Sequence, residues 1–281
     1  MPRLYAKRAP RPHENRKIPG APPICASGRP RGHTALRSGS LGRPDPCYRR
    51  GTVQQPSDLY FRQVPIGPMA NFIYLIGSRS TRTCVVVDPA WDTDAICRLA
   101  EADGMSIVGA LVTHYHPDHV GGGMLGFKVP GGVAELIARV PAKIHVHKLE
   151  ADGLKQVTGV SESDLVRREG GDRLALGDVE VTFIHTPGHT PGSQCFLVRD
   201  ALVAGDTLFV DGCGRVDLPG GDARQMYESL TGPLAALSDD VVLYPGHDYG
   251  RVQASPLGEQ RRTNRYLRIR SREDWLRLMG R

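Results

Sequence analysis

Three histidines and one aspartate stand within six residues, and this spacing is typical of a transition-metal site. Side chains at positions i and i+2 point the same way from an extended strand, so His114 and His116 can converge on one ion where the predicted strand 107–113 ends. Asp118 and His119 then face a second position. The segment therefore predicts a metalloenzyme.

Proline and glycine are expected to shape the chain around this cluster. Pro117 is expected to bar a helix through the cluster, because its ring blocks helical hydrogen bonding. The run Gly121-Gly122-Gly123 would let the backbone turn sharply past a bound metal.

Three further candidate ligands each follow a short apolar run: His189 after 179–185, Asp206 after 201–204 and His247 after 241–244. Loops on a rigid scaffold are where catalytic groups concentrate. Five histidines with two aspartates are enough for two ions about 3.5 to 4 Å apart.

This ordered set resembles the metallo-β-lactamase fold superfamily over about residues 58 to 270. The His-x-His-x-Asp-His signature is followed in order by His189, by Asp206 in Gly-Asp-Thr-Leu-Phe, and by His247. The resemblance implies an α+β fold of four αββα layers, with two packed β-sheets flanked by helices. His119 stands where the main zinc β-lactamases usually carry another residue, so the pattern is more similar to glyoxalase II, persulfide dioxygenases and lactonases.

The resemblance also implies how the ligands divide: His114, His116 and His189 for one ion, Asp118, His119 and His247 for the other, and Asp206 as a bridge. The implied cofactors are two Zn(II) ions, or a mixed zinc and iron pair. A metal-bound hydroxide would attack a thioester carbonyl, and Asp118 would be the catalytic residue that orients it or takes its proton. We therefore expect a metal-dependent hydrolase that cleaves a glutathione thioester, like hydroxyacylglutathione hydrolase.

Other chemistry stays open on the same residues. In persulfide dioxygenases a single Fe(II) is held by residues that match His114, His189 and Asp206. Both families keep all seven positions, so a glutathione persulfide dioxygenase is the main alternative. Another hydrolase of the fold, such as a lactonase or phosphodiesterase, is a further one, and a non-catalytic binding protein is the least favoured because no ligand is missing.

Substrate-binding candidates come from the same resemblance. Arg215, after Gly-Cys-Gly, and Tyr249 would help to hold glutathione, and Arg262 would reach a glycine carboxylate. Arginine suits a tripeptide with two carboxylates because its fork binds bidentately. The alternative for each arginine is a solvated surface group. Cys213 is either a reactive thiol or a packed turn residue, and packing is the favoured interpretation.

Charge separates the chain into two parts. Residues 1–57 hold 12 Lys and Arg against 2 acids, about +10, whereas the remainder holds 24 against 28, about −4. Proline, glycine and arginine dominate the first part, which predicts a disordered basic extension before a catalytic domain at 58–281. A targeting peptide, a weak nucleic-acid contact and an extension without function all remain open for it, and the last is favoured.

Composition also limits location and partners. No apolar run approaches the ~18 residues that a membrane span needs. Few, irregularly spaced cysteines indicate a reducing compartment, so we expect a cytoplasmic protein. Its expected partner is a small glutathione derivative, without membrane or nucleic acid, and a homodimer stays open.

Periodicity predicts the elements that position these residues. The predicted strands are 60–64, 71–76, 83–87, 107–113, 143–147, 179–185, 194–198 and 201–204. The predicted helices are 93–102, 133–140, 151–157 and one after Asp222, which carries Met226, Leu230 and Leu234 on one face. His145 and His147 follow plain strand alternation, and no carboxylate follows at ligand spacing. A final short helix begins with a capping box of Ser271 and Asp274, and Trp275, Leu278 and Met279 form its apolar stripe.

Overall fold

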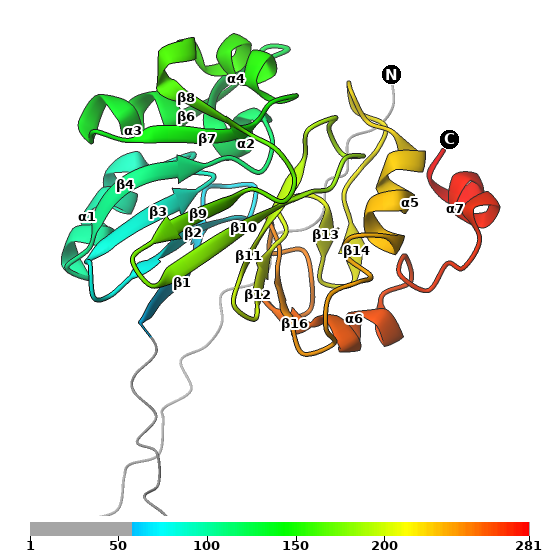
Figure 1. Ribbon diagram of the computed structural model, residues 1–281. Helices are drawn as coiled ribbons and strands as arrows, with labels where there is room; N and C mark the ends of the chain where they lie inside the picture. The colour runs from blue at the N-terminus through cyan, green and yellow to red at the C-terminus, as the bar shows by residue number, and fades with distance from the viewer. Residues whose placement is uncertain (1–57, 281) are drawn as a thin grey trace, which may run out of the picture. The chain divides into compact units, whose positions relative to one another are not determined.

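Two six-stranded mixed β-sheets pack against each other with helices on their outer sides, as the computed structural model of the chain shows (Figure 1). The structure describes residues 58–280, so the expected basic extension and Arg281 lie outside the described residues. Along residues 58–280 no helix is long and apolar enough to cross a membrane. The layering confirms the fold predicted from the ligand pattern.

The first sheet combines an antiparallel half with a parallel half. Its order is β1 (Leu59–Ile66), β2 (Asn71–Ser78), β3 (Thr83–Val87), β4 (Ser106–Leu111), β7 (Lys143–His147) and β8 (Leu165–Arg168). Strands β1 to β3 pair antiparallel, and β3, β4, β7 and β8 pair parallel. Helices α1 (Thr93–Ala102), α3 (Val133–Arg139) and α4 (Ala151–Thr158) pack on its outer face.

The second sheet is antiparallel except between β12 and β15. Its order is β16 (Ser255–Pro256), β15 (Val242–Tyr244), β12 (Ala201–Val203), β11 (Gln194–Val198), β10 (Val179–His185) and β9 (Arg173–Leu176). Helices α5 (Ala223–Thr231), α6 (Leu257–Thr263) and α7 (Arg272–Met279) cover its outer face.

Short elements that periodicity did not predict complete the fold: the helix α2 (Pro117–Val120), the hairpins β5 (Gly121–Met124) with β6 (Phe127–Gly132) and β13 (Leu208–Phe209) with β14 (Gly212–Cys213), and a 3₁₀ turn at Glu162–Asp164. Strands β8, β9 and β16 and helix α6 were also not predicted. Most of these elements are four residues or shorter, which is too short for an apolar period to show.

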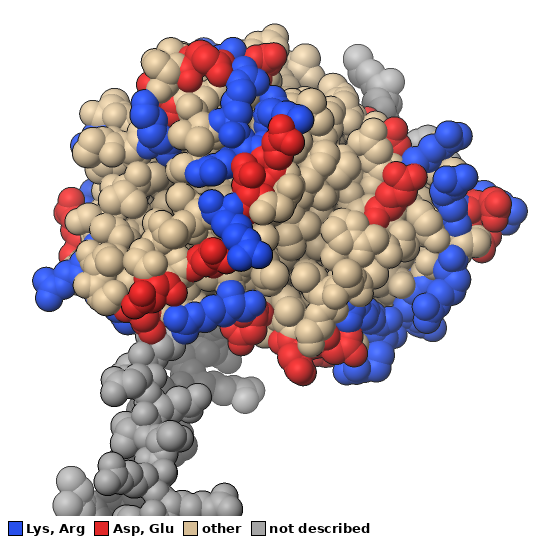
Figure 2. Space-filling model, in the orientation of Figure 1, with Lys and Arg blue, Asp and Glu red and all other residues tan. Residues whose placement is uncertain are grey.

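Charged side chains of both signs lie side by side on the face drawn in Figure 2. Near α4, Lys155 lies 3.0 Å from Asp152 and 2.9 Å from Glu162, and Arg167 also pairs with Glu162 at 2.7 Å. Exposed pairs of this kind each contribute only ~0 to 1 kcal/mol. The stability of the folded region 58–280 must therefore come mainly from its apolar clusters.

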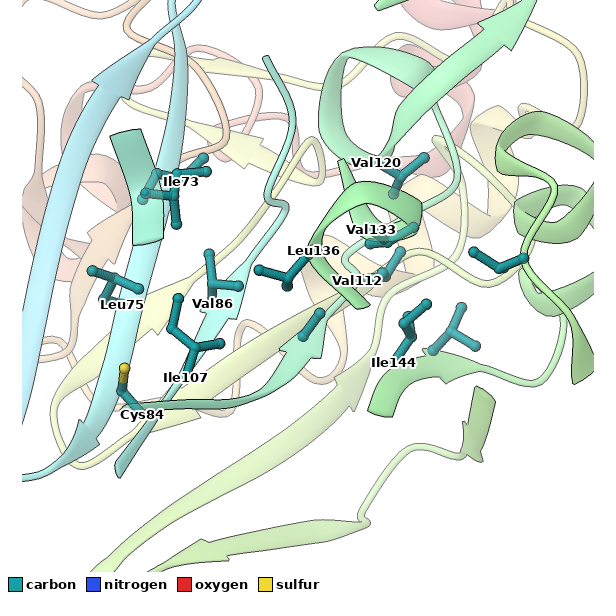
Figure 3. Close-up of a cluster of buried hydrophobic side chains, with 14 of the residues drawn as sticks. Ile73, Leu75, Cys84, Val86, Ile107, Val112, Val120, Val133, Leu136 and Ile144 are labelled. Atoms are coloured by element: carbon teal, nitrogen blue, oxygen red, sulfur yellow. The ribbon is translucent and has the colours of Figure 1, made fainter. Parts of the chain in front are cut away.

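Three apolar clusters fill the spaces between the four layers. Strand β2 is buried along its whole length because it serves two of them. Ile73 and Leu75 face the helices α1 and α3 (Figure 3), whereas Phe72, Tyr74 and Ile76 face the second sheet. Since alternate side chains of a strand point to opposite faces, a strand that is buried on both faces needs a continuous apolar run.

The third cluster includes the final helix. Ser271 caps α7 by accepting a hydrogen bond from the backbone N–H of Asp274. Trp275 is buried, and its Nε1 donates to the Ala223 carbonyl 2.6 Å away. Leu278 was predicted on the packed stripe but is 44% exposed, because Leu276 takes that place beside Met279.

We predict that Trp275→Ala lowers the free energy of unfolding by about 3 to 5 kcal/mol, because it removes a large buried ring and the Nε1 hydrogen bond. Leu278→Ala, the exposed control on the same helix, should stay within about 0.5 kcal/mol of the unaltered protein. Urea denaturation followed by circular dichroism measures both, and equal effects would contradict the assigned packing of α7.

Candidate metal centre

The structure brings the seven predicted ligands together at the edge where the two sheets meet. His114 and His116 lie in the loop after β4, and Asp118 and His119 lie in α2. The other three stand in loops after strands of the second sheet: His189 after β10, Asp206 after β12 and His247 after β15. All five histidines are at most 6% exposed, so their ring nitrogens are shielded from water.

The ligand atoms form three overlapping groups, each with its atoms within 4.8 Å of one another: His114, His116 and His189; His114, His119 and Asp206; and Asp118, His119 and His247. Asp206 connects the first and last groups, since its Oδ2 lies 3.7 Å from His189 Nε2 and its Oδ1 lies 3.4 Å from His247 Nε2. These buried His and Asp groups are consistent with a binuclear metal site.

Pro117 keeps α2 from extending back through His114 and His116, as expected, but a short helix begins at the proline itself. The proline stands in the first turn, where its missing N–H leaves no hydrogen bond unmade. The helix is only four residues long, and it turns Asp118 and His119 toward the site. A proline cannot follow an earlier helical turn, but it suits the start of one.

Four of the histidines are oriented through Nδ1. The donated hydrogen bonds run from His114 to Thr113 Oγ1 (3.0 Å), from His119 to Asp88 Oδ2 (3.0 Å), from His189 to the Arg215 carbonyl (2.7 Å) and from His247 to the Met69 carbonyl (3.0 Å). Each bond leaves Nε2 directed into the site. A partner on the far nitrogen is the usual way in which a metal-binding histidine is held.

Unpartnered polar atoms show that the cluster fits cations. His114 Nε2 and Asp206 Oδ1 are buried without a hydrogen bond. His116 Nδ1 lies 3.0 Å from His189 Nε2, and His119 Nε2 lies 3.1 Å from His247 Nε2. A buried polar atom without a partner costs about 1 to 3 kcal/mol. Imidazole nitrogens and carboxylate oxygens are ligands for zinc and iron, so bound cations would satisfy these atoms together.

Two histidines of the cluster balance its carboxylates. Burial lowers the pKa of His247, but Asp206 and Asp118 outweigh burial and raise this pKa to about 9. The same carboxylates raise the pKa of His119 well above its usual value. Burial and neighbouring positive charge instead lower the pKa of His116 to about 4. Burial opposes ionisation of Asp118, yet His119 and His247 hold the pKa of its carboxyl below the usual range.

Asp88 was not predicted as part of the site, although it holds two of its segments. This buried carboxylate ends β3, with Oδ1 accepting from the Thr113 backbone N–H at 2.8 Å. Its Oδ2 accepts from Thr113 Oγ1 at 2.6 Å and from His119 Nδ1 at 3.0 Å. In the sequence, Asp88 is recognisable only as the residue between a predicted strand and a proline. Its position beside the parallel strand β4 was the available signal.

Glu150 is a second positioning residue that the sequence did not reveal. It is fully buried, its Oε2 accepts from the Tyr115 N–H at 2.9 Å, and its Oε1 accepts from the Gly192 N–H at 2.6 Å. The carboxylate thus joins the loop of His114 and His116 to the loop of His189. A side chain at Gly192 would place its Cβ 2.7 Å from the Glu150 Cγ, so glycine is required there.

The predicted substrate residues lie apart from one another: Tyr249 is beside His247, and Arg215 is beside His189. Tyr249 stacks on the His247 ring at 4.6 Å and is 59% exposed. Arg215 is exposed and paired with Asp217 at 2.9 Å, while its backbone carbonyl orients His189. Arg262 lies in the last turn of α6, where its charge acts on Glu259.

Other predicted residues take structural places. Cys213 packs in the third apolar cluster, and burial raises its pKa to about 12, so the thiol stays protonated. His145 and His147 are buried in β7 outside the three ligand groups. His147 stacks on His185 at 4.0 Å, and His145 accepts from Arg168 Nε at 3.2 Å.

Comparison with known proteins agrees with this geometry. Residues 66–247 match the sequence profile of the Metallo-beta-lactamase superfamily. The chain belongs to this superfamily, as a metal-dependent enzyme with a His and Asp metal site.

Individual relatives of this superfamily member differ in their chemistry. The human mitochondrial persulfide dioxygenase ETHE1 is 32% identical over 74% of this chain and 76% of its own length. The hydroxyacylglutathione hydrolase of Tolumonas auensis is 36% identical over 64% of this chain and 62% of its own length. A crystal structure of ETHE1 from Myxococcus xanthus superposes with a TM-score of 0.68 and 29% identity, covering 79% of this chain and 90% of that one.

We predict that metal binding at pH 7.5 releases at least one proton, because a ligating histidine must be neutral and the contacting pair His119 and His247 has raised pKa values. Zinc affinity should therefore rise with pH up to about 9, the pKa of His247. Calorimetric titration in buffers of different ionisation enthalpy measures the release. Binding without proton release would contradict the proposed ligand roles of these two histidines.

We predict that Glu150→Gln weakens binding of the more tightly held zinc ion by about 10- to 100-fold, the range for partners that orient ligands. The amide nitrogen cannot accept the bond from Tyr115 or Gly192, so one ligand loop loses its anchor. Competition with a chromophoric chelator measures this affinity. Glu169→Gln, an exposed control, should leave it unchanged, and equal affinity in both variants would show that Glu150 does not position the loops.

Proposed function

We propose that this protein is a two-metal hydrolase that cleaves a glutathione thioester. The observation that carries the proposal is the pair of complete ligand sets that share Asp206. The first set is His114, His116 and His189, and the second is Asp118, His119 and His247. The rings of His119 and His247 in the second set are buried and oriented like those of the first, so the residues can hold two ions.

The residues around the site support this chemistry. Bound in pairs, divalent cations lower the pKa of water and polarise a carbonyl oxygen. Asp118 is held by Asn71, whose Nδ2 donates to its Oδ2 at 3.1 Å. Its lowered pKa keeps Asp118 ionised near neutral pH, so it can orient the attacking water or accept its proton. A thiolate leaving group, with a thiol pKa of about 8.5, needs little help from a general acid.

The glutathione part of the proposal rests on two exposed residues, Tyr249 beside His247 and Arg215 beside His189. Burial and the nearby carboxylates raise the pKa of Tyr249 to about 12, so its hydroxyl stays protonated and can donate to a substrate oxygen. Arg215 offers a guanidinium that can exchange Asp217 for a substrate carboxylate. Similarity to the hydroxyacylglutathione hydrolase of Tolumonas auensis supports the same substrate class.

A cytoplasmic location and a small-molecule partner belong to this proposal. The cysteines of the described region, Cys84, Cys97, Cys195 and Cys213, are all free. Free thiols are typical of a reducing compartment.

We predict that zinc-loaded protein hydrolyses lactoylglutathione and that Asp118→Asn lowers kcat by about 10²- to 10⁴-fold, because the amide cannot take a proton. Loss of absorbance of the thioester measures the rate, and metal analysis of each variant separates lost chemistry from lost metal. Asp240→Asn, at an exposed site, is the matched control. Full activity of zinc-loaded Asp118→Asn would remove Asp118 from the mechanism.

Persulfide dioxygenation is the second candidate, and similarity to the human ETHE1 protein favours it. Its single Fe(II) would use His114, His189 and Asp206, a set of two histidines and one carboxylate that leaves open coordination positions. If the protein is a hydrolase as proposed, iron-loaded protein should consume no oxygen when glutathione persulfide is added. Rapid uptake that disappears in His189→Ala would instead establish the dioxygenase.

A further inference from the structure

A groove of about 590 Å³ lies beside the metal centre, on the side away from Tyr249, and no charged side chain lines it. Its walls come from the loop at Tyr115, the β5–β6 hairpin, the start of α4 and the loops at Pro191 and Pro219. The volume lies within the ~300 to 1,000 Å³ of small-molecule sites. Charged residues make up 23% of the chain, yet none lines this groove. An uncharged lining favours an uncharged ligand.

The groove is continuous with the ligand loops. Tyr115 stands between His114 and His116, and its ring centroid is 5.3 Å from that of His116. Pro191 follows His189 by two residues, and both belong to the loop that Glu150 anchors. None of the seven ligands lines the groove, but Tyr115 and Pro191 connect it to two ligand loops, so a chain that extends from the metal centre can enter it.

Close backbone packing gives the groove its shape. Gly122, at φ +82°, starts the hairpin, and a Cβ there would lie 2.2 Å from the Val157 carbonyl oxygen, so the hairpin lies directly on α4. Gly153 faces the Tyr115 ring, which a Cβ would approach to 3.0 Å. Larger residues at these positions would displace the groove walls.

Apolar side chains remain at the solvent side of the groove. Leu125 at the tip of the hairpin is 87% exposed, and Leu149 at the start of α4 is 55% exposed. Met124 and Val157 lie between them along the lining. Exposed apolar side chains that adjoin one another commonly mark a binding surface. Their direct continuation into the ligand loops indicates that the occupant is part of the substrate.

We propose that this groove binds an apolar acyl group of the substrate, next to the carbonyl that is attacked. The proposal rests on the proposed hydrolase function and narrows its substrate class from thioesters of small hydroxy acids to thioesters of longer, uncharged acyl chains. The thiol half would lie toward Tyr249, and the acyl half would lie along Tyr115 and Leu149.

Binding of octanoate and acetate to zinc-loaded protein tests the groove without catalysis. The carboxylate is common to both probes, and each buried methylene adds about fourfold in affinity, so octanoate should bind at least about tenfold more tightly. Leu149→Asp should bring the two affinities to within about threefold, because a charge then faces the chain. Leu278→Asp, at a leucine of similar exposure on α7, should keep the full preference. Calorimetry measures all three proteins.

Leu125→Asp at the hairpin tip serves as a second groove variant, since its side chain is too exposed to matter for folding. Equal affinity of octanoate and acetate for the unaltered protein would overturn the proposal. So would an octanoate preference that both groove variants retain. If the groove variants instead convert a dimer into a monomer without changing the preference, as measured by light scattering, the surface binds a second copy and the proposal fails.

Hydrolysis of acetyl- and octanoylglutathione separates this inference from the proposed function. The unaltered protein should have a higher kcat/KM for octanoylglutathione than for acetylglutathione. Leu149→Asp should lower the ratio of these two values about tenfold. No hydrolysis of either thioester, with the octanoate preference intact, would remove the hydrolase function and leave the groove as an apolar site. Equal hydrolysis of both thioesters, without an octanoate preference, would remove the groove and leave the hydrolase.

Discussion

Seven ionisable side chains must share one buried space at the edge of two sheets, where water can no longer satisfy them. Each therefore needs another partner. Four histidines direct Nδ1 to oxygens outside the cluster and keep Nε2 for a cation. Two buried carboxylates outside the ligand set, Asp88 and Glu150, accept hydrogen bonds from the ligand loops and hold them. The geometry of the site depends on these hydrogen-bond partners as much as on the ligands themselves.

The same constraint joins the two sheets. Gln194, at the start of β11 in the second sheet, donates from Nε2 to the Val112 carbonyl at the end of the first. Asn71, at the start of β2, donates to Asp118, and its neighbour Phe72 donates its backbone N–H to the Gly246 carbonyl at 2.8 Å. These bonds tie the ligand loops of one sheet to the other sheet across the layer boundary. This rigidity keeps metal ligands in geometry before any substrate binds.

The two sides of the metal centre differ in chemistry. Toward His247 the surface carries Tyr249, whose hydroxyl can donate a hydrogen bond. Toward His116 it carries Tyr115 and the uncharged groove beneath Leu149. A substrate with one polar end and one apolar end would be oriented by this difference alone. Specificity in this fold is thus a property of the loops, while the layers beneath them supply the common scaffold.

The sequence by itself determined the set of ligand candidates, because their spacing is local, and the order of these ligands implied the fold through the resemblance that it carries. The signature from His114 to His119 and the later His189, Asp206 and His247 each follow an apolar run, and strand alternation placed the long strands. A single local pattern could not decide elements of a few residues, such as α2, which begins at Pro117 and was not predicted.

Only the tertiary structure decided which residues hold the ligands and where the substrate side is apolar. Glu150 lies 35 residues from Tyr115 and 42 from Gly192, yet contacts both. In a sequence it is one acid among 30, and nothing local distinguishes it. The groove likewise joins Tyr115, Leu149, Pro191 and Pro219 from four separate segments. Contacts between distant segments form only when the layers pack, so the local spacing of residues cannot predict them.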